Sequence, residues 1–186
     1  QGPPTDYALA EQAIQTGQID VGLKGLERAA KQNNLRAQLK LGHLYREGRL
    51  VSLDVVKACH YFGQAANGHA NFDAKHPAAS MVGEAYFNLA ECYAKGIPGS
   101  TEWQQNITKA AEAYYNGGVI FGDPQALYHL AMAYLKGEGV AKNPRLGMNF
   151  LLSASRKFHR PAQARYGFFL WVGKMMKRQA GPGLAL

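Results

Sequence analysis

One pattern of side chains recurs along this chain: alanine, leucine, a small residue, tyrosine and glycine at relative positions 0, 4, 5, 8 and 11. The three clear copies begin at Ala37, Ala85 and Ala126. Positions 0, 4 and 8 fall on one face of an α-helix, and a glycine at position 11 is typical of a helix C-terminus. Weaker copies open at Asp6 and Ala162, so the pattern predicts a repeat protein whose array runs along the whole chain.

Each signature helix is followed by a short loop and a segment that predicts a second helix. In the first clear unit, Asp54 is placed to cap a helix that ends at Gly68. In the third, Pro144 stands where a helix begins and no amide proton is needed. We therefore expect an all-α solenoid of about five helical pairs, the last incomplete, as one elongated domain over residues 6–186. Residues 1–5 are predicted to be a tag remnant or a disordered N-terminus.

These residues resemble the Sel-like repeat, a subclass of the tetratricopeptide solenoids. The segments that carry the resemblance are Gly137-Glu138-Gly139-Val140 and Asp54-Val55-Val56-Lys57-Ala58. The resemblance implies a right-handed solenoid of helix-turn-helix units in which the first helix of each pair lines the concave surface.

Two insertions interrupt the regular repeat. Successive signature alanines are 48, 41 and 36 residues apart, and only the last spacing is near the unit of the family. We expect the first insertion, residues 69–83, to extend the first helix of the third pair at its N-terminus, with Pro77 opening it. The second, residues 97–105, predicts a loop that holds Trp103, which either covers its own repeat or contacts a partner.

The charge balance gives a formal net charge of +8, from 21 Lys and Arg against 13 Asp and Glu. The basic residues are interpreted as scattered, apart from Lys174, Lys177 and Arg178, and this argues against a nucleic-acid groove. No apolar stretch approaches the roughly 20 residues of a membrane-spanning helix, so no membrane insertion is expected. The chain does not begin with Met, which is compatible with an export signal that has been removed.

The two cysteines, Cys59 and Cys92, lie in predicted helices of neighbouring repeats. We favour two small buried apolar side chains over a disulfide, because nothing in the sequence fixes their separation. On this interpretation the cysteines do not identify the cellular compartment.

The sequence offers little for catalysis. None of the six histidines has the spacing of a metal site, and the glycines at 137 and 139 follow a helix end and not a strand. Most of the conspicuous carboxylates stand at predicted helix starts, where capping explains them. We therefore expect no catalytic residue, no metal and no cofactor.

A binding surface is the better prediction. The first helices place Leu39, Phe87 and Tyr128 two residues after the signature alanine, His43, Glu91 and Met132 six after it, and Arg46 and Leu135 nine after it. Such a row suits an amphipathic helix or an extended peptide, although the first set could equally be core packing. The polar row three residues after the alanine, which holds Lys40, Asn88, His129 and Arg165, is expected to be solvated surface.

The arrangement of repeats and insertions is also similar to exopolysaccharide regulators of alphaproteobacteria, over nearly the whole chain. The features that carry this likeness include the His76-Pro77 insertion, the Gly96-Ile97-Pro98-Gly99 loop and Leu170-Trp171. The resemblance implies a non-enzymatic periplasmic protein that binds the sensory domain of a membrane histidine kinase and represses its two-component signalling. A generic interaction scaffold is the alternative, and a hydrolase of the cysteine-rich repeat type is a weaker one.

Two further expectations concern assembly and pH. The incomplete last pair leaves Phe168, Phe169 and Trp171 in need of a cover, which a second copy of the chain could supply as a homodimer. Mild acidification would raise the charge of the six histidines, and His43, in the predicted groove, is the best candidate for a pH-dependent contact with the partner.

Overall fold

The computed structural model describes residues 5–181, and within them it is entirely helical, with no strand. The α-helices are α1 (Asp6–Gln15), α2 (Ile19–Lys31), α3 (Leu35–Glu47), α4 (Val55–Asn67), α5 (Ala79–Lys95), α6 (Ile107–Tyr115), α7 (Pro124–Lys136), α8 (Pro144–Arg156) and α9 (Arg160–Ala180). A short π-helix, η1 (Asn116–Ile120), continues α6. The predicted all-α solenoid is confirmed.

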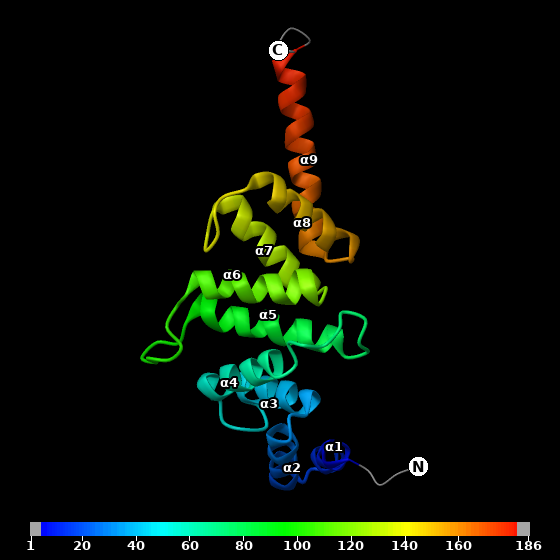
Figure 1. Cartoon of the computed structure of the whole chain (residues 1–186), viewed down its shortest axis with the longest axis vertical. Helices are drawn as coiled ribbons and strands as arrows, with labels where there is room; N and C mark the ends of the chain where they lie inside the picture. Colours follow the sequence, from blue (N-terminus) through cyan, green and yellow to red (C-terminus); the bar gives the residue numbers. More distant parts are fainter. Residues whose placement is uncertain (1–4, 182–186) are drawn as a thin grey trace.

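The helices pack as successive pairs along one axis: α1 with α2, α3 with α4, α5 with α6, and α7 with α8. The pairs follow one another from the N-terminal end to α9, which projects from the opposite end of the stack (Figure 1). Among the described residues α9 packs on α8 and no helix follows it, which agrees with the expected incomplete last pair. Residues 1–4, where most of the predicted tag remnant falls, lie outside the described residues, and Thr5 caps α1.

Local sequence signals explain where most helices begin and end. The side chains of Asp54, Asn106 and Asn143 each accept a hydrogen bond from the backbone amide three residues later, at the start of α4, α6 and α8. These bonds satisfy amide groups that a helix N-terminus leaves free. Gly48 and Gly137 end α3 and α7 in the left-handed conformation, with φ of 65° and 79°. A side chain there would be strained, which explains the signature glycine.

Both insertions lie where they were expected, but Pro77 does not open α5, because it lies in the turn before the helix, whose N-cap is Ala78. Helix α5 begins at Ala79, six residues before its signature alanine, whereas α3 and α7 begin two residues before theirs. The second insertion is the loop between α5 and α6.

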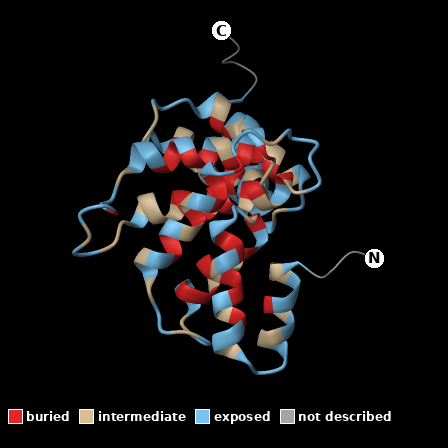
Figure 2. Cartoon of the chain, turned by 60° about the horizontal axis from the view of Figure 1, so that its bottom comes forward, coloured by how far each residue is buried: buried red, intermediate tan, exposed pale blue. Residues whose placement is uncertain are grey.

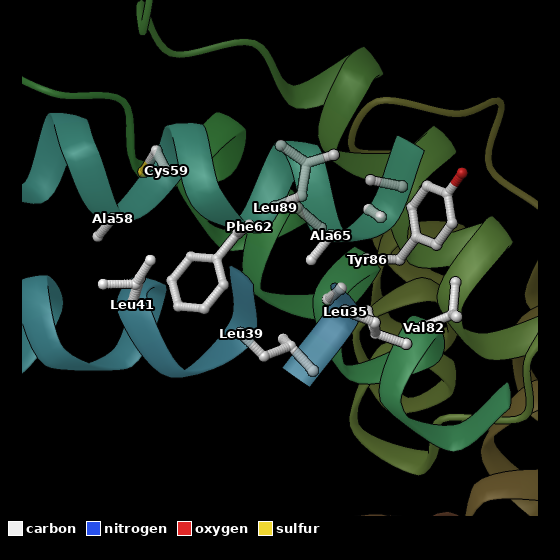
Figure 3. Close-up of a cluster of buried hydrophobic side chains, with 14 of the residues drawn as sticks. Leu35, Leu39, Leu41, Ala58, Cys59, Phe62, Ala65, Val82, Tyr86 and Leu89 are labelled. Carbon is white, nitrogen blue, oxygen red and sulfur yellow. The ribbon is translucent and has the colours of Figure 1, made fainter. Parts of the chain in front are cut away.

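The core runs along the stack in place of a single centre. Buried residues gather on the sides of the helices that face one another, and the exposed positions lie outside (Figure 2). At the join of α3 and α4, the Phe62 ring points toward α3 beside Leu39 and Leu41 (Figure 3). Phe62 is 1% exposed, and its ring lies where a Cβ on Gly42 would be, at 2.5 Å from the nearest ring atom. The small residue of the signature therefore lets an aromatic ring fill the space between paired helices.

The π-helix was not predicted. Its wider turn is visible in the bond from the Phe121 amide to the Asn116 carbonyl, which spans five residues at 3.2 Å. Gly117 lies against the backbone of Gly83 on α5, and Gly118 against the backbone of Leu127 on α7. These glycines let η1 approach both neighbouring first helices closely.

The two cysteines correct one prediction. Cys59 of α4 and Cys92 of α5 form a disulfide that joins two successive helical pairs across 33 residues of sequence, with their Cα atoms 6.0 Å apart. The prediction of two free buried thiols was wrong because the packing of α4 against α5 sets the separation of the cysteines, and that packing is not visible in their sequence spacing.

Phe158, in the turn between α8 and α9, combines two unusual properties. Its φ is 62°, a conformation that bulky side chains rarely adopt, and its side chain is 85% exposed. The corresponding turn between α2 and α3 places Asn33 in the same conformation, with φ of 61°. Asparagine tolerates this region better than phenylalanine does.

We expect the Phe158→Asn variant to be more stable than the parent chain by about 1 kcal/mol, because it removes backbone strain and loses almost no buried surface. Urea titration followed by circular dichroism measures the difference. An equal or lower urea midpoint for the variant would show that the turn is not strained, or that contacts of the Phe158 ring stabilise the fold.

Candidate functional site

The first helices α3, α5 and α7 lie in sequence along the stack, and α5 contacts both of the others. Their predicted groove residues separate into two groups. His43, Arg46, Phe87, Glu91, Tyr128, Met132 and Leu135 keep exposed surface, whereas Leu39 is 6% exposed and belongs to the core. Of the two interpretations that the sequence left open for the first row, core packing holds for Leu39.

A polar cluster joins α3 to α5. His43 Nε2 lies 2.7 Å from Glu84 Oε1, and Arg46 places one guanidinium nitrogen 2.8 Å from His43 Nδ1. Arg46 also donates to the side-chain oxygen of Asn88, whose own amide donates to the Glu84 carbonyl at 2.9 Å. The hydrogen bond with His43 holds the pKa of Glu84 below its usual value, although burial opposes this. We call these four residues the polar cluster.

An aromatic cluster continues the surface from α5 to α7 and the start of α9. The His129 ring stacks on Tyr114 with centroids 5.0 Å apart, and it also lies near Phe87 and Tyr128, both at 5.5 Å. Tyr128 extends the contact to His159, at 5.1 Å. We call these five residues the aromatic cluster. Stacked rings of this kind give a surface that is rigid and partly apolar.

Glu91 of α5 contacts two members of the aromatic cluster, Tyr114 and His129. It accepts a hydrogen bond from the Tyr114 hydroxyl, pairs with Lys95 at 2.8 Å, and lies 3.9 Å from His129 Nδ1. Burial alone would raise the pKa of Glu91, but the hydrogen bonds from Lys95 and Tyr114 hold it below its usual value. Burial and Glu91 together raise the pKa of the Tyr114 hydroxyl. This group is therefore a carboxylate held by a neutral phenol and an ammonium.

A cleft of about 330 Å³ opens beside the aromatic cluster. Its walls include Tyr128 and Met132 from α7, Tyr114 from α6, and Arg165 from α9. The apolar and aromatic lining, with an arginine and Glu138 at its boundary, can accept a side chain of a bound segment. Leu135 packs instead against Gly147 of α8.

Trp103 does not present a surface to a partner. It is 5% exposed, and its ring lies 5.4 Å from that of Tyr93 and 5.7 Å from that of His60. The aromatic residue on the inserted loop is therefore buried between its own repeat and α4 of the preceding pair.

Sequence reasoning missed five residues of the two clusters: Glu84, Asn88, Tyr114, His129 and His159. Asn88 and His129 belong to the row that was expected to be solvated, yet Asn88 is 3% exposed and His129 lies among rings. The expectation was wrong for Asn88, which faces the neighbouring repeat, and it holds for Arg165, which is exposed. The His129 side chain lies between these cases, since it contacts rings and keeps 41% of its surface exposed. The signal available was the pair of polar residues Glu84 and Asn88, four apart on one helix face.

The surroundings of His129 predict a pH dependence of the free energy of unfolding. Burial lowers the pKa of its imidazole, which Glu91 only partly opposes. The unfolded chain therefore takes up a proton near pH 6.5, before the folded chain does. We expect the free energy of unfolding to fall as pH decreases through this value, and to fall less in His129→Phe, which retains a ring. Urea titrations between pH 8 and about pH 5 measure this.

Between pH 7 and 8 both proteins should show a flat profile, since the His129 ring stays neutral there in either state. Parallel profiles for the two proteins throughout the acidic range would assign the acid response to other groups. The contact of His43 with a partner at acidic pH is a separate expectation, and it stays a prediction.

Two absences can be stated for residues 5–181. No three histidine, cysteine, aspartate or glutamate side chains gather closely enough to hold a metal ion. No helix in this range is both long and apolar enough to cross a lipid bilayer.

Comparison with known families and structures identifies the repeat. The Sel1 repeat pattern matches residues 35–68, 83–116 and 124–157, which are the three pairs that follow α1 and α2. A Sel1 repeat protein from Oxalobacter formigenes superimposes with a TM-score of 0.62 at 24% identity, covering 78% of this chain and 96% of its own. A protective antigen of uropathogenic Escherichia coli strains, with the same type of fold, reaches a TM-score of 0.69 at 24% identity over 90% of this chain and 33% of its own.

Two curated relatives carry the name exopolysaccharide production negative regulator. The protein of Rhizobium leguminosarum bv. viciae is 26% identical over 188 aligned residues, which include all of this chain and 67% of the relative. That of Rhizobium meliloti (strain 1021) is 24% identical over 169 residues, 89% of this chain and 61% of the relative. The chain thus spans about two thirds of the length of these relatives.

Proposed function

Because the chain belongs to the Sel1 repeat family, we propose that it is a non-enzymatic regulator that works by binding another protein. Its partner in this proposal is the sensory domain of a membrane histidine kinase, whose two-component signalling it represses. The relatives that align with most or all of the chain are named as negative regulators of exopolysaccharide production. The choice of a kinase as the partner rests on the family resemblance, and the choice of the binding surface rests on the geometry of the two clusters.

The observation that carries the interaction role is the pair of polar and aromatic clusters, which meet on α5 at the neighbouring residues Phe87 and Asn88. Together they extend from His43 on α3 to His159 at the start of α9, and their members hold one another through hydrogen bonds and ring contacts. A surface that is already ordered loses little conformational freedom on binding. Arginine and tyrosine are frequent among the residues that dominate binding energy. The polar cluster contains Arg46, and the aromatic cluster contains Tyr128.

The disulfide supports a location outside the cytoplasm. Disulfides such as Cys59–Cys92 persist in oxidising compartments, of which the bacterial periplasm is one. The sensory domain of a membrane kinase would face the same compartment. We therefore propose that the protein acts in the periplasm.

The test is a calorimetric titration of the purified chain into the sensory domain of the kinase from the same organism. We expect binding that weakens at least tenfold in Arg46→Ala and in Tyr128→Ala, as at other interface hot spots. Arg28→Ala is the matched control, because Arg28 is exposed on α2, away from both clusters. Unchanged affinity in both site variants, with their circular dichroism preserved, would contradict the proposed surface.

The alternative is a generic scaffold without a signalling output. A scaffold could bind the sensory domain, but it would leave the autophosphorylation of the full-length kinase unchanged. A regulator lowers that rate when it is added in excess. The hydrolase alternative gains no support from the Helicobacter pylori cysteine rich protein B. At 18% identity and a TM-score of 0.53, over 88% of this chain and 98% of that one, this likeness concerns the fold alone.

A further inference from the structure

The positive charge of the chain is concentrated at one end. Residues 1–138 contain twelve Lys and Arg and thirteen Asp and Glu, whereas residues 139–186 contain nine Lys and Arg and no acidic residue. The nine are Lys142, Arg145, Arg156, Lys157, Arg160, Arg165, Lys174, Lys177 and Arg178, and all of them are exposed. The interpretation of the basic residues as scattered therefore holds only for the first 138 residues.

Large apolar side chains are exposed within the same basic segment. On α9 they are Phe168, Leu170, Trp171 and Met176, and Trp171 is 59% exposed. Phe168 and Trp171 are three residues apart with ring centroids at 6.3 Å, and Met175 is four residues further along the same face. Lys177 lies on the opposite side of the helix, whereas Lys174 and Arg178, three and seven residues after Trp171, lie beside the aromatic face. Leu170 lies among the basic residues. The second half of α9 therefore combines exposed apolar side chains with charge of one sign.

The position of α9 leaves this surface free among the described residues. Its first half packs on the preceding pair through Ala162, with Tyr166 and Phe169 beside the same buried cluster. Beyond these residues the helix extends away from the stack (Figure 1). The strained and exposed Phe158 stands immediately before α9. Within residues 5–181, Phe168 and Trp171 thus keep most of their side-chain surface exposed, and their ring contacts are with residues of α9 itself.

We propose that α9 binds the surface of a membrane that contains anionic phospholipids. In this arrangement the helix lies along the interface, with Phe168, Trp171 and Met176 among the first methylene groups of the acyl chains. Lys174, Lys177 and Arg178 extend toward the phosphate groups, since their long side chains can bring the charge to the aqueous boundary. The helix lies on the membrane and does not cross it.

The observations favour a lipid surface over two other occupants. Nucleic acid would use the basic residues and the aromatic rings, but it gives no role to the exposed methionine and leucine side chains. A second copy of the chain, the homodimer expected from the sequence, would bring two surfaces of nine positive charges together without a single carboxylate between them. A membrane with phosphatidylglycerol satisfies both the charge and the apolar side chains.

This inference is independent of the kinase. Lipid binding can be measured with the purified chain alone, so its failure would leave the proposed regulator intact, and the reverse is also true.

The experiment uses vesicles of phosphatidylcholine with roughly one third phosphatidylglycerol, compared with vesicles of phosphatidylcholine alone. Trp171 is exposed and Trp103 is buried, so a blue shift of tryptophan fluorescence reports on α9. We expect a shift with the anionic vesicles that is lost in Trp171→Phe, and partitioning by sedimentation at least tenfold stronger than to the neutral vesicles. High salt should weaken the partitioning.

Two matched pairs of variants separate the contributions. Partitioning should fall at least tenfold in the triple variant of α9 with Lys174→Gln, Lys177→Gln and Arg178→Gln. It should not fall in the control triple variant of α2, which loses the same charge through Lys24→Gln, Arg28→Gln and Lys31→Gln. Phe168→Ser with Trp171→Ser should also reduce it tenfold or more, whereas Val21→Ser with Leu53→Ser, at exposed positions elsewhere, should not.

Several results would overturn the proposal. One is the absence of partitioning to anionic vesicles, and another is equal partitioning to neutral ones. A third is a concentration-dependent dimer that dissociates in the double variant Phe168→Ser and Trp171→Ser, since this would assign the face to a second copy of the chain. Binding to DNA or RNA that competes fully with vesicles, and that depends on the charges but not on Phe168 and Trp171, would assign it to a polyanion.

Discussion

Reduction of the Cys59–Cys92 disulfide is expected to lower the free energy of unfolding by about 4 kcal/mol. The bond closes a loop of 33 residues, and opening it returns conformational freedom to the unfolded chain. It also ties α4 to α5, the join between the second and third helical pairs. Each pair of a solenoid contacts only its neighbours, so a weaker join here should also lower the cooperativity of unfolding.

Urea titrations with and without a reducing agent measure this loss. The variant with Cys59→Ser and Cys92→Ser is the control, because it should match the reduced protein and should not respond to the reductant. Equal midpoints for the oxidised and reduced chain would mean that the cross-link adds nothing to the packing of the two pairs.

Replacing Phe62 by alanine should destabilise the fold by about 4 kcal/mol, the loss typical of a fully buried phenylalanine. The ring occupies the space that Gly42 leaves, and no other side chain can fill it without moving the helices. The same ring supports the polar cluster, since His43 lies edge-on at 5.2 Å and the Arg46 guanidinium lies over it at 5.2 Å. Phe62→Ala should therefore weaken partner binding as well as stability.

Thermal and urea unfolding measure the stability of Phe62→Ala, and titration of the kinase sensory domain measures its binding. Tyr61→Ala is a suitable comparison, because Tyr61 is adjacent in sequence but only half-buried, stacked on Tyr45 at 6.0 Å. We expect it to cost about 1 kcal/mol. A loss of that smaller size for Phe62→Ala would show that the pair of helices can close around the missing ring.

The fold could be predicted from the sequence because its information is local and repeated. Each signature helix carries its own packing face, and most of its ends are marked by a capping side chain or a glycine within a few residues. The longer α5 could be inferred from the length of the insertion, but its start could not, because Pro77 lies in the turn before the N-cap Ala78.

The site was less predictable because it depends on contacts between repeats. The stacking of α3, α5 and α7 decides which polar side chains meet, and it buries Asn88 and places the half-exposed His129 against aromatic rings. The disulfide escaped prediction for the same reason. The concentration of basic residues after Glu138, by contrast, can be read from the sequence, but only when the acidic residues are counted over the same range.

The π-helix η1 has a consequence for how this protein can change in evolution. A π turn accommodates about one residue more than an α turn, so η1 is a place where a helix has absorbed an extra position. Deleting one residue between Asn116 and Ile120 would rotate everything downstream by about 100° about the axis of α6. The direction in which α7, α8 and the basic α9 leave the stack is thus set by a single residue of length, and lineages that gain or lose it would aim the same C-terminal helix at a different target.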